Sequence, residues 1–219
     1  GKVMINDNPV EIGQKVQDGD IVKVDNKIVT QKNKFVYLAL NKPIGITSTT
    51  DQTDPNNIVD FMKYPARIFH VGRLDKDSEG LILMTNDGDI VNKILRSGNN
   101  HEKEYLVKVD QPLTSQFIRA MSTGVPILKS ITKPCKVEYV DEYIFRIVLT
   151  EGLNRQIRRM CNHFGYHVVK LKRVRIMHIP LDVKSGKWRY LTNIEISTLK
   201  ELVEASSKTE EASAKDKSI

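Results

Sequence analysis

A short polar loop carries the residues of this sequence that are best suited to chemistry. Asp75 lies in the segment GRLDKDSEG at positions 72–80, between two apolar runs at positions 67–71 and 81–85. Both runs are rich in β-branched and aliphatic residues, which predicts a strand on each side. A loop held between buried strands can expose a reactive carboxylate without losing its position. The same residue types are ordinary turn formers, so on residue types alone a simple turn is favoured.

A second segment offers cations that such a carboxylate would need. The segment GLNRQIRRM at positions 152–160 continues to Phe164, and Gly165 then gives a helix stop signal. As a helix it places an apolar face opposite a polar face that holds Arg155, Arg158 and Arg159. A carboxylate in a water-poor site stays ionised only beside a cation. Periodicity alone is explained equally by an amphipathic helix whose arginines are solvated.

The charge distribution points to a polyanionic partner. The chain has a formal net charge of +7, and no Asp or Glu occurs from Gly152 to Leu181. Seven basic residues lie in that window: Arg155, Arg158, Arg159, Lys170, Lys172, Arg173 and Arg175. A surface of one sign is the footprint of a protein that follows phosphates. The alternative is the solvated face of a basic protein.

Size and composition exclude several classes of protein. With 219 residues, the chain has room for one large domain and a small appendage. No apolar run approaches the roughly 18 residues that a membrane span needs, and the N-terminus lacks the apolar core of a signal peptide. Cys135 and Cys161 match no metal-ligand spacing. We therefore expect a monomeric cytoplasmic protein without disulfides, metal or cofactor.

The chain divides into three parts by composition. Positions 1–32 contain short strands with turn residues, too little to bury a core alone. Positions 33–203 alternate strands with a few helices in irregular order, which favours an α+β fold with a mixed, mainly antiparallel sheet and flanking helices. Positions 204–219 contain mostly Ser, Ala, Lys and Glu, which predicts a disordered tail.

Four motifs in the expected order, between about positions 34 and 199, resemble those of RNA pseudouridine synthases of the ribosomal-RNA (RsuA-like) branch. The motifs are NKPIG at 41–45, GRLDKDSEGL at 72–81, KEY at 103–105 and NRQIR at 154–158. The resemblance implies the pseudouridine synthase fold and a catalytic role for Asp75. It also implies that Tyr105 stacks on the flipped base and transfers the C5 proton, and that Arg158 pairs with Asp75.

The resemblance also implies a set of RNA contacts. Leu171 matches an apolar residue that packs on the target base, and Arg73 is placed to brace the gap that the base leaves. Lys42 is implied to be structural or RNA-facing. We further expect phosphate contacts from Arg155, Arg159, Arg173 and Arg175. Positions 1–32 resemble the second half of an S4-type RNA-binding domain, so we expect the chain to begin inside such a domain.

The resulting hypothesis is an enzyme that isomerises a uridine in RNA to pseudouridine. The segments EGLNRQIRRMC at 151–161 and GVPIL at 124–128 look most like the F-type synthase of large-subunit ribosomal RNA. A stem-loop of 23S ribosomal RNA is the expected substrate, with transfer RNA as the alternative. Two other interpretations stay open. One is a non-catalytic RNA-binding or ribosome-assembly protein on the same fold, and the other is a nucleosidase acting on small nucleosides.

Overall fold

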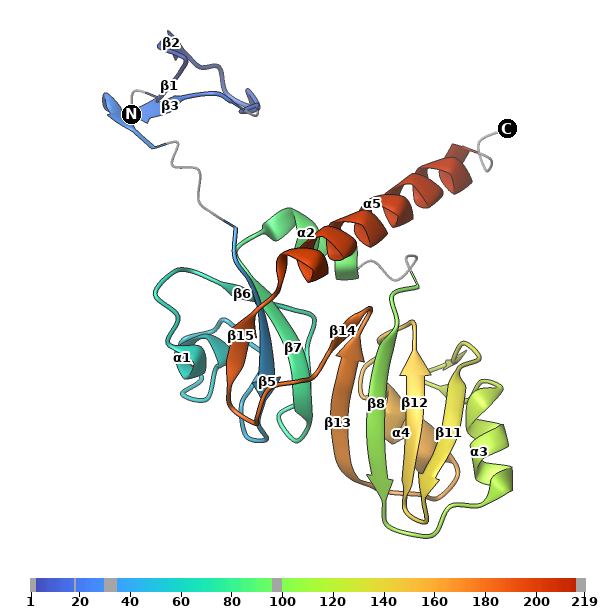
Figure 1. The fold of residues 1–219 in the computed structure, drawn as a ribbon. Coiled ribbons are helices and arrows are strands. Elements are labelled where there is room, and N and C mark those ends of the chain that lie inside the picture. Colours follow the sequence, from blue (N-terminus) through green and yellow to red (C-terminus); the bar gives the residue numbers. More distant parts are fainter. Residues whose placement is uncertain (1–2, 18, 30–34, 96–99, 216–219) are drawn as a thin grey trace. The chain divides into compact units, whose positions relative to one another are not determined.

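The computed structural model describes residues 3–17, 19–29, 35–95 and 100–215. The chain forms two compact units, residues 1–35 and 36–219 (Figure 1). The division lies three residues beyond the boundary that composition suggested. Within the described residues, no helix is long and apolar enough to cross a membrane.

The first unit is a small antiparallel sheet. Its strands are β1 (Val3–Ile5), β2 (Asn8–Pro9), β3 (Val22–Val24) and β4 (Lys27–Ile28), in the order β2-β1-β3-β4. Among its described residues only Ile5 is buried. The unit therefore has almost no core of its own, as the short strands of the sequence predicted.

The second unit contains one large mixed sheet in the order β11-β12-β8-β13-β7-β5-β15, with β6 on β7 and β14 on β13. Its strands are β5 (Tyr37–Lys42), β6 (Phe69–Val71), β7 (Glu79–Thr85), β8 (Lys103–Val109), β11 (Lys136–Asp141), β12 (Ile144–Leu149), β13 (Val168–Ile176), β14 (Ile179–Pro180) and β15 (Trp188–Tyr190). A separate hairpin joins β9 (Pro126–Ile127) to β10 (Ser130–Ile131). Among the described strands, β7 and β13 make the parallel pair and all other pairs are antiparallel. The predicted α+β fold with a mainly antiparallel sheet is confirmed.

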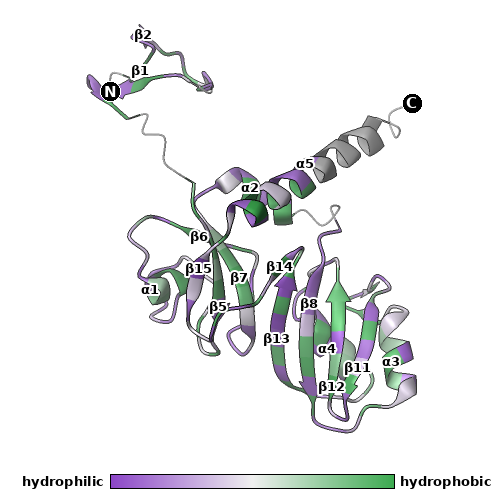
Figure 2. Cartoon of the chain, viewed as in Figure 1, coloured by the Kyte–Doolittle hydropathy of each residue, from purple (hydrophilic) through white to green (hydrophobic). Residues whose placement is uncertain are grey.

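Strands β5 and β7 are buried on both faces, which explains their continuous apolar runs. Along β5, Leu38 and Leu40 join one core cluster, whereas Tyr37 and Ala39 join another. Side chains alternate between the two faces of a strand, so each face needs its own cover. Figure 2 shows the contrast with β13, where hydrophilic and hydrophobic residues alternate.

Helices cover these two faces. The first cluster is covered by α1 (Ile58–Met62), α3 (Ser115–Ser122) and α4 (Gln156–His163). The second is covered by α2 (Gly88–Leu95) and by the beginning of α5 (Asn193–Lys215). The N-terminus of α3 is capped by Thr114, whose hydroxyl accepts a hydrogen bond from the Phe117 amide at 3.1 Å.

Helix α5 continues to Lys215, into the segment for which the sequence predicted a disordered tail. Ala, Glu and Lys have high intrinsic helix propensities, so a segment that lacks large apolar residues still extends a helix that is already nucleated. The start of α5 is a capping box. The Thr192 hydroxyl accepts from the Glu195 amide at 3.2 Å, and the Glu195 carboxylate accepts from the Thr192 amide at 2.7 Å. Residues 216–219 lie outside the described residues.

We expect Glu195→Gln to lower the free energy of unfolding by about 2 kcal/mol at pH 7. Hydrogen bonds from Arg189 at 2.7 and 2.8 Å, opposed by burial, lower the pKa of Glu195 from 4.5 to about 2. Its stabilisation is therefore present above pH 4.5 and is lost as the pH falls toward 2. Urea unfolding at pH 7 and pH 2.5 measures both effects. The exposed Glu201→Gln serves as control, and an equal loss in both variants contradicts the prediction.

Candidate active site

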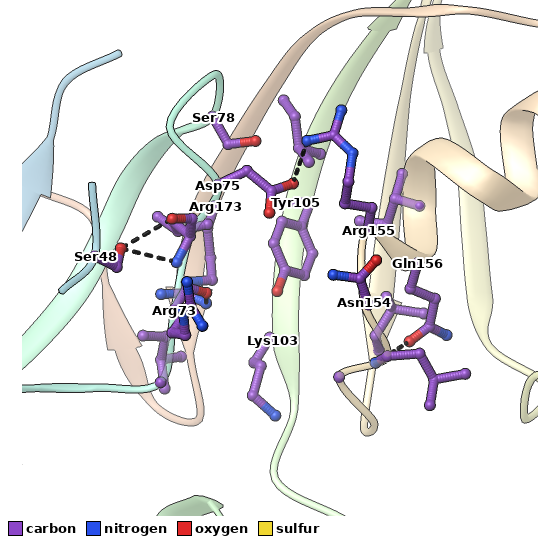
Figure 3. A pocket seen from close by; sticks show the side chains of 18 of the residues that line it. Ser48, Arg73, Asp75, Ser78, Lys103, Tyr105, Asn154, Arg155, Gln156 and Arg173 are labelled. Atoms are coloured by element: carbon purple, nitrogen blue, oxygen red, sulfur yellow. Dashed lines mark hydrogen bonds and ion pairs between the residues drawn. The ribbon is translucent and has the colours of Figure 1, made fainter. Parts of the chain in front are cut away.

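The loop that carries Asp75 follows β6 and is fixed at its backbone. The Ser48 hydroxyl donates to the Leu74 carbonyl at 2.9 Å and accepts from the Leu74 amide at 3.1 Å (Figure 3). The Gly45 amide donates to the Lys76 carbonyl at 2.8 Å. The loop is thus attached to the segment after β5 on both sides of Asp75. A fixed backbone lets the Asp75 carboxylate stay one-third exposed without being mobile.

Gly80 brings this loop close to β13. A Cβ atom at Gly80 would lie 2.3 Å from the Arg173 carbonyl oxygen and 2.6 Å from its amide nitrogen. The residue also has a φ of +115°, which side chains rarely permit. Only glycine therefore allows β7 and β13 to pair in parallel at this point, where Gly80 lies opposite Arg173. Gly80 therefore allows the loop that carries Asp75 to lie close to β13.

The arginine segment reaches the loop from the other side. Helix α4 begins at Gln156, later than the sequence suggested, and Arg155 precedes it in a left-handed conformation with φ of +48°. A non-glycine residue in this region costs about 1 kcal/mol or more, and such residues cluster at functional sites. The turn takes Arg155 off the helix face and directs its guanidinium toward the loop.

Two carboxylates share the two arginines. Arg155 lies 3.2 Å from the Asp75 carboxylate and also donates to both oxygens of Asp77, at 3.1 and 3.2 Å. Arg158 lies 3.2 Å from the Asp77 carboxylate but 4.0 Å from that of Asp75. The structure therefore brings the predicted Asp75–Arg158 pair together at the limit of an ion pair. It also adds a closer contact from Arg155, for which the sequence had suggested a phosphate contact.

Arg158 is the more buried of the two guanidinium groups. It donates to the Val168 carbonyl and the Asp77 carbonyl at 3.1 Å, and to the Ser78 hydroxyl at 3.3 Å. These bonds join α4, the start of β13 and the loop that carries Asp75. Burial acts to raise the pKa of Asp77, but the Arg155 hydrogen bond and the Arg158 charge outweigh it and lower that pKa. The Asp77 carboxylate is therefore ionised at neutral pH, between the two guanidinium groups that hold it.

A cavity of about 1030 Å³ opens beside Asp75. Tyr105 from β8 and Leu171 from β13 line it, and both side chains are buried. Arg73 also lines it and is exposed. In Figure 3 the Tyr105 ring lies next to the Asp75 carboxylate, with Arg155 across the cavity from Arg73. One cavity is thus lined by four residues to which the resemblance gave roles: the carboxylate of Asp75, the ring of Tyr105, the apolar side chain of Leu171 and the bracing side chain of Arg73.

Lys42 does not reach this cavity. Its side chain is fully buried, and its ammonium donates to the carbonyls of Pro43 at 3.0 Å and Ile46 at 2.8 Å. Of the two roles predicted for Lys42, structural or RNA-facing, its burial favours the structural one, because a fully buried group has no surface for RNA. Its hydrogen bonds hold the segment to which the loop that carries Asp75 is attached.

We expect Lys42→Met to lower the free energy of unfolding by about 1–2 kcal/mol at pH 7, because two buried carbonyls lose their donor. Burial lowers the pKa of Lys42 from 10.5 to about 8, with a further lowering by Arg173 that the nearby carboxylates oppose. The unfolded chain then binds more protons between pH 8 and 10.5, so Lys42 stabilises the fold more as the pH rises.

The difference between wild type and Lys42→Met should therefore grow between pH 7 and pH 10, as measured by urea unfolding. Lys108→Met removes an exposed ammonium from β8 and should change stability by less than about 0.5 kcal/mol at both pH values. A difference that shrinks with pH contradicts the assignment.

Two arginines of the basic window are not the surface phosphate contacts that the sequence predicted. Arg173 is buried, and its guanidinium donates to the carbonyls of Leu81 at 2.7 Å and Arg73 at 3.4 Å. Arg175 pairs with Glu102 at 2.9 Å and Glu104 at 2.8 Å, so its charge is compensated within the protein. Strand pairing brings these carbonyls and acids to the arginines of β13, so neither guanidinium lies free on the surface. Arg159 stays exposed, and its guanidinium donates to the backbone and side-chain oxygens of Asn154 at 3.0 and 3.1 Å.

Sequence reasoning missed several residues of the site. Ser48, His101 and Lys103 line the cavity, as do Asn154 and Gln156. Gln156 joins the turn before α4 to Glu151, donating at 2.6 Å and accepting from the Leu153 amide at 3.1 Å. Lys103 could have been found, because it stands two residues before Tyr105 on one strand and therefore on the same face. Ser48 gave no local signal.

The geometry defines an enzyme rather than a passive binding module. An ionised carboxylate beside guanidinium groups, at a cavity with an aromatic wall, can act at the anomeric carbon of a bound nucleotide. Residues 36–163 match the family model described as RNA pseudouridylate synthase. The chain belongs to the RNA pseudouridine synthase family.

Individual relatives agree. The chain is 53% identical over 220 residues to the dual-specificity RNA pseudouridine synthase RluF of Escherichia coli (strain K12), covering 99% of this chain and 76% of that protein. It is 34% identical to the ribosomal large subunit pseudouridine synthase B of Bacillus subtilis (strain 168), over 93% and 87% of the two chains. A crystal structure of a pseudouridylate synthase superposes with a TM-score of 0.73 at 32% identity, over 90% of this chain and 88% of the other.

The chain is therefore an RNA pseudouridine synthase, an isomerase that acts on uridine in RNA. The interpretations as a non-catalytic RNA-binding protein and as a nucleosidase for free nucleosides are not supported by these similarities.

Proposed function

We propose that this enzyme isomerises a specific uridine in large-subunit ribosomal RNA, with Asp75 as the catalytic carboxylate. One observation carries the assignment to Asp75. Its carboxylate faces the cavity that Tyr105 and Leu171 line, and it lies 3.2 Å from the nearest guanidinium nitrogen. Asp77 carries the same chemistry, but its carboxylate makes three close nitrogen-to-oxygen contacts with Arg155 and Arg158. Asp75 is thus the freer of the two carboxylates.

The proposed reaction is an isomerisation that needs no oxidant and no imported group. Asp75 attacks or stabilises C1′ of the ribose while the bond from C1′ to N1 of uracil breaks. The uracil then turns within the cavity and its C5 bonds to C1′, and where Asp75 has attacked C1′ the bond from Asp75 to C1′ breaks in this step and frees the carboxylate. The C5 proton leaves, and N1 ends with a proton, so atoms balance. Tyr105 is the proposed stacking partner of the uracil and the group that transfers the C5 proton.

The target base has to leave the RNA stack to reach Asp75, at a cost of a few kcal/mol. Arg73 stands two residues before Asp75, exposed at the cavity, where it is placed to brace the vacated position. Leu171 supplies an apolar wall against the base. Arg155 and Arg158 keep Asp77 ionised and lie beside Asp75, and Arg159 is the proposed exposed phosphate contact. These proposed roles combine the family resemblance with the positions of the side chains in the structure.

The large-subunit assignment rests on the relatives, which are named for dual-specificity and for the large ribosomal subunit. We further propose that the enzyme acts as a monomer in the cytoplasm, where its two free cysteines would stay reduced. Residues 1–32 are proposed to be the second half of an S4-type RNA-binding domain.

The test is to incubate the protein with unmodified 23S and 16S ribosomal RNA and unmodified transfer RNA, and to map pseudouridine in each. Product at one or a few sites of the 23S RNA is expected. Product only in 16S RNA or only in transfer RNA would contradict the large-subunit assignment. No product in any of the three would contradict the proposed function as a whole.

A further inference from the structure

Three basic side chains line the cavity near Tyr105, two of them on the same face of the sheet as its ring. Lys103 precedes Tyr105 by two residues on β8, and Arg173 lies directly opposite Tyr105 on β13. Side chains two apart on a strand point to the same face, as do residues opposite each other across a pair. His101 precedes Lys103 by two further residues. All three line the cavity that contains Asp75.

These side chains hold donors that the protein leaves unused. The Nη2 of Arg173 and the Nε2 of His101 are buried and have no hydrogen-bond partner among the described residues, and both residues are more than nine-tenths buried. Among the described residues, the Lys103 ammonium donates one hydrogen bond, to the His101 carbonyl at 3.0 Å, of the three that it can donate. An unsatisfied buried donor costs about 1–3 kcal/mol, so such a group indicates a missing ligand.

Lys103 and Arg173 also repel each other, and His101 is held in its neutral form. Burial and then the Arg173 charge lower the pKa of Lys103 to about 8, and burial and then the Lys103 charge lower the pKa of His101. The acids of the cavity are engaged elsewhere. Asp75 and Asp77 pair with Arg155, and Glu151 accepts from Gln156. Figure 3 shows Arg173 and Arg73 on one wall, Lys103 below Tyr105, and Arg155 and Gln156 on the facing wall.

We propose that Lys103, Arg173 and His101 form an anion corner that binds the RNA phosphate adjoining the extruded uridine. The inference rests on the proposed function, because the RNA supplies the anion. A nucleotide with its C1′ at Asp75 and its base on Tyr105 carries its phosphates one ribose away from C1′. A uracil carbonyl would accept hydrogen bonds but would leave the cations uncompensated. A phosphate does both, and charge-assisted bonds to it are the stronger ones.

The proposal predicts a phosphate contact at Lys103 that can be detected in the salt dependence of RNA binding. The probe is hexauridylate, and its affinity is measured by fluorescence anisotropy from 20 to 300 mM salt. Each phosphate contact on a single strand contributes about 0.7 to the slope of log affinity against log salt. Lys103→Gln should lower that slope by about 0.7 and weaken binding at low salt by roughly tenfold. Lys103→Arg keeps the charge and should restore the slope.

Lys108→Gln is the matched control, because Lys108 lies on the same strand but is exposed and points to the opposite face. It should keep the wild-type slope. An unchanged slope in Lys103→Gln, an equal fall in both variants, or no binding of hexauridylate by the wild-type protein at low salt would overturn the proposal. Thermal unfolding verifies that both variants fold. The titration needs no product, so a Lys103-dependent slope without pseudouridine in any RNA refutes the proposed function alone.

Discussion

Replacing Asp75 with Asn should abolish pseudouridine formation while RNA binding changes little. The variant keeps the size and hydrogen-bonding reach of the side chain but removes the charge required at C1′. Loss of a catalytic nucleophile lowers rates by about four orders of magnitude or more. Arg155 loses one of its two carboxylate partners and keeps Asp77 at 3.1 Å, so we expect the loop to stay attached to it.

Two measurements on the RNA that the wild-type enzyme modifies separate binding from chemistry. Anisotropy gives the affinity, which should stay within about threefold of wild type, because the phosphate contacts lie on other residues. Single-turnover product formation gives the chemical step. Turnover by a verified Asp75→Asn protein at more than a thousandth of the wild-type rate would remove Asp75 from its proposed role.

The second large effect is expected at Arg158. Its guanidinium joins the catalytic loop to α4 and to the start of β13 through Asp77, Ser78 and Val168, and it lies 4.0 Å from Asp75. Arg158→Met removes these bonds together with a charge near a carboxylate, which is strongly destabilising in a partly buried site. We expect the single-turnover rate to fall by roughly 10²–10³-fold. Arg158→Lys should retain part of the rate, because it keeps the charge without the planar fork.

Arg159→Met is the neighbouring comparison, since Arg159 is exposed and its guanidinium donates to Asn154. It should weaken RNA binding and leave the rate on saturating RNA within about threefold of wild type. Arg155→Met should lower the single-turnover rate more than Arg159→Met does, because Arg155 makes the shortest contact to Asp75. Equal single-turnover defects in the Arg158 and Arg159 variants would contradict a specific role for Arg158.

The parts of the fold that local patterns specify were predictable from sequence. The run KEYLVKV alternates and forms β8 at the predicted positions, and the apolar runs on either side of Asp75 form β6 and β7. Strand β13 was not predicted, because its sequence VVKLKRVRI places charged residues on a strand whose Leu171 and Arg173 are both buried. Its position is set by pairing with β8 and β7, which are distant in sequence. Local propensity carries no such information.

The site divides in the same way. Motif positions identified Asp75, Tyr105 and Leu171, and the structure places all three at one cavity. Burial and charge pairing were not readable, and for that reason Lys42 and Arg175 were assigned to RNA. The buried ammonium of Lys42 meets carbonyls of its own segment, and Arg175 meets Glu102 and Glu104 on β8. A run of basic residues predicts net charge, whereas the fold decides which charges are free.

The most direct test of the central claim compares two carboxylates that stand two residues apart. Asp75→Asn and Asp77→Asn are assayed side by side for single-turnover pseudouridine formation on the same ribosomal RNA. Both residues contact Arg155 and Arg158, so a purely electrostatic or structural role predicts similar losses. Our account predicts no detectable product with Asp75→Asn and measurable product with Asp77→Asn, whose carboxylate only holds the arginines. Product from Asp75→Asn, or equal residual rates in the two variants, would contradict it.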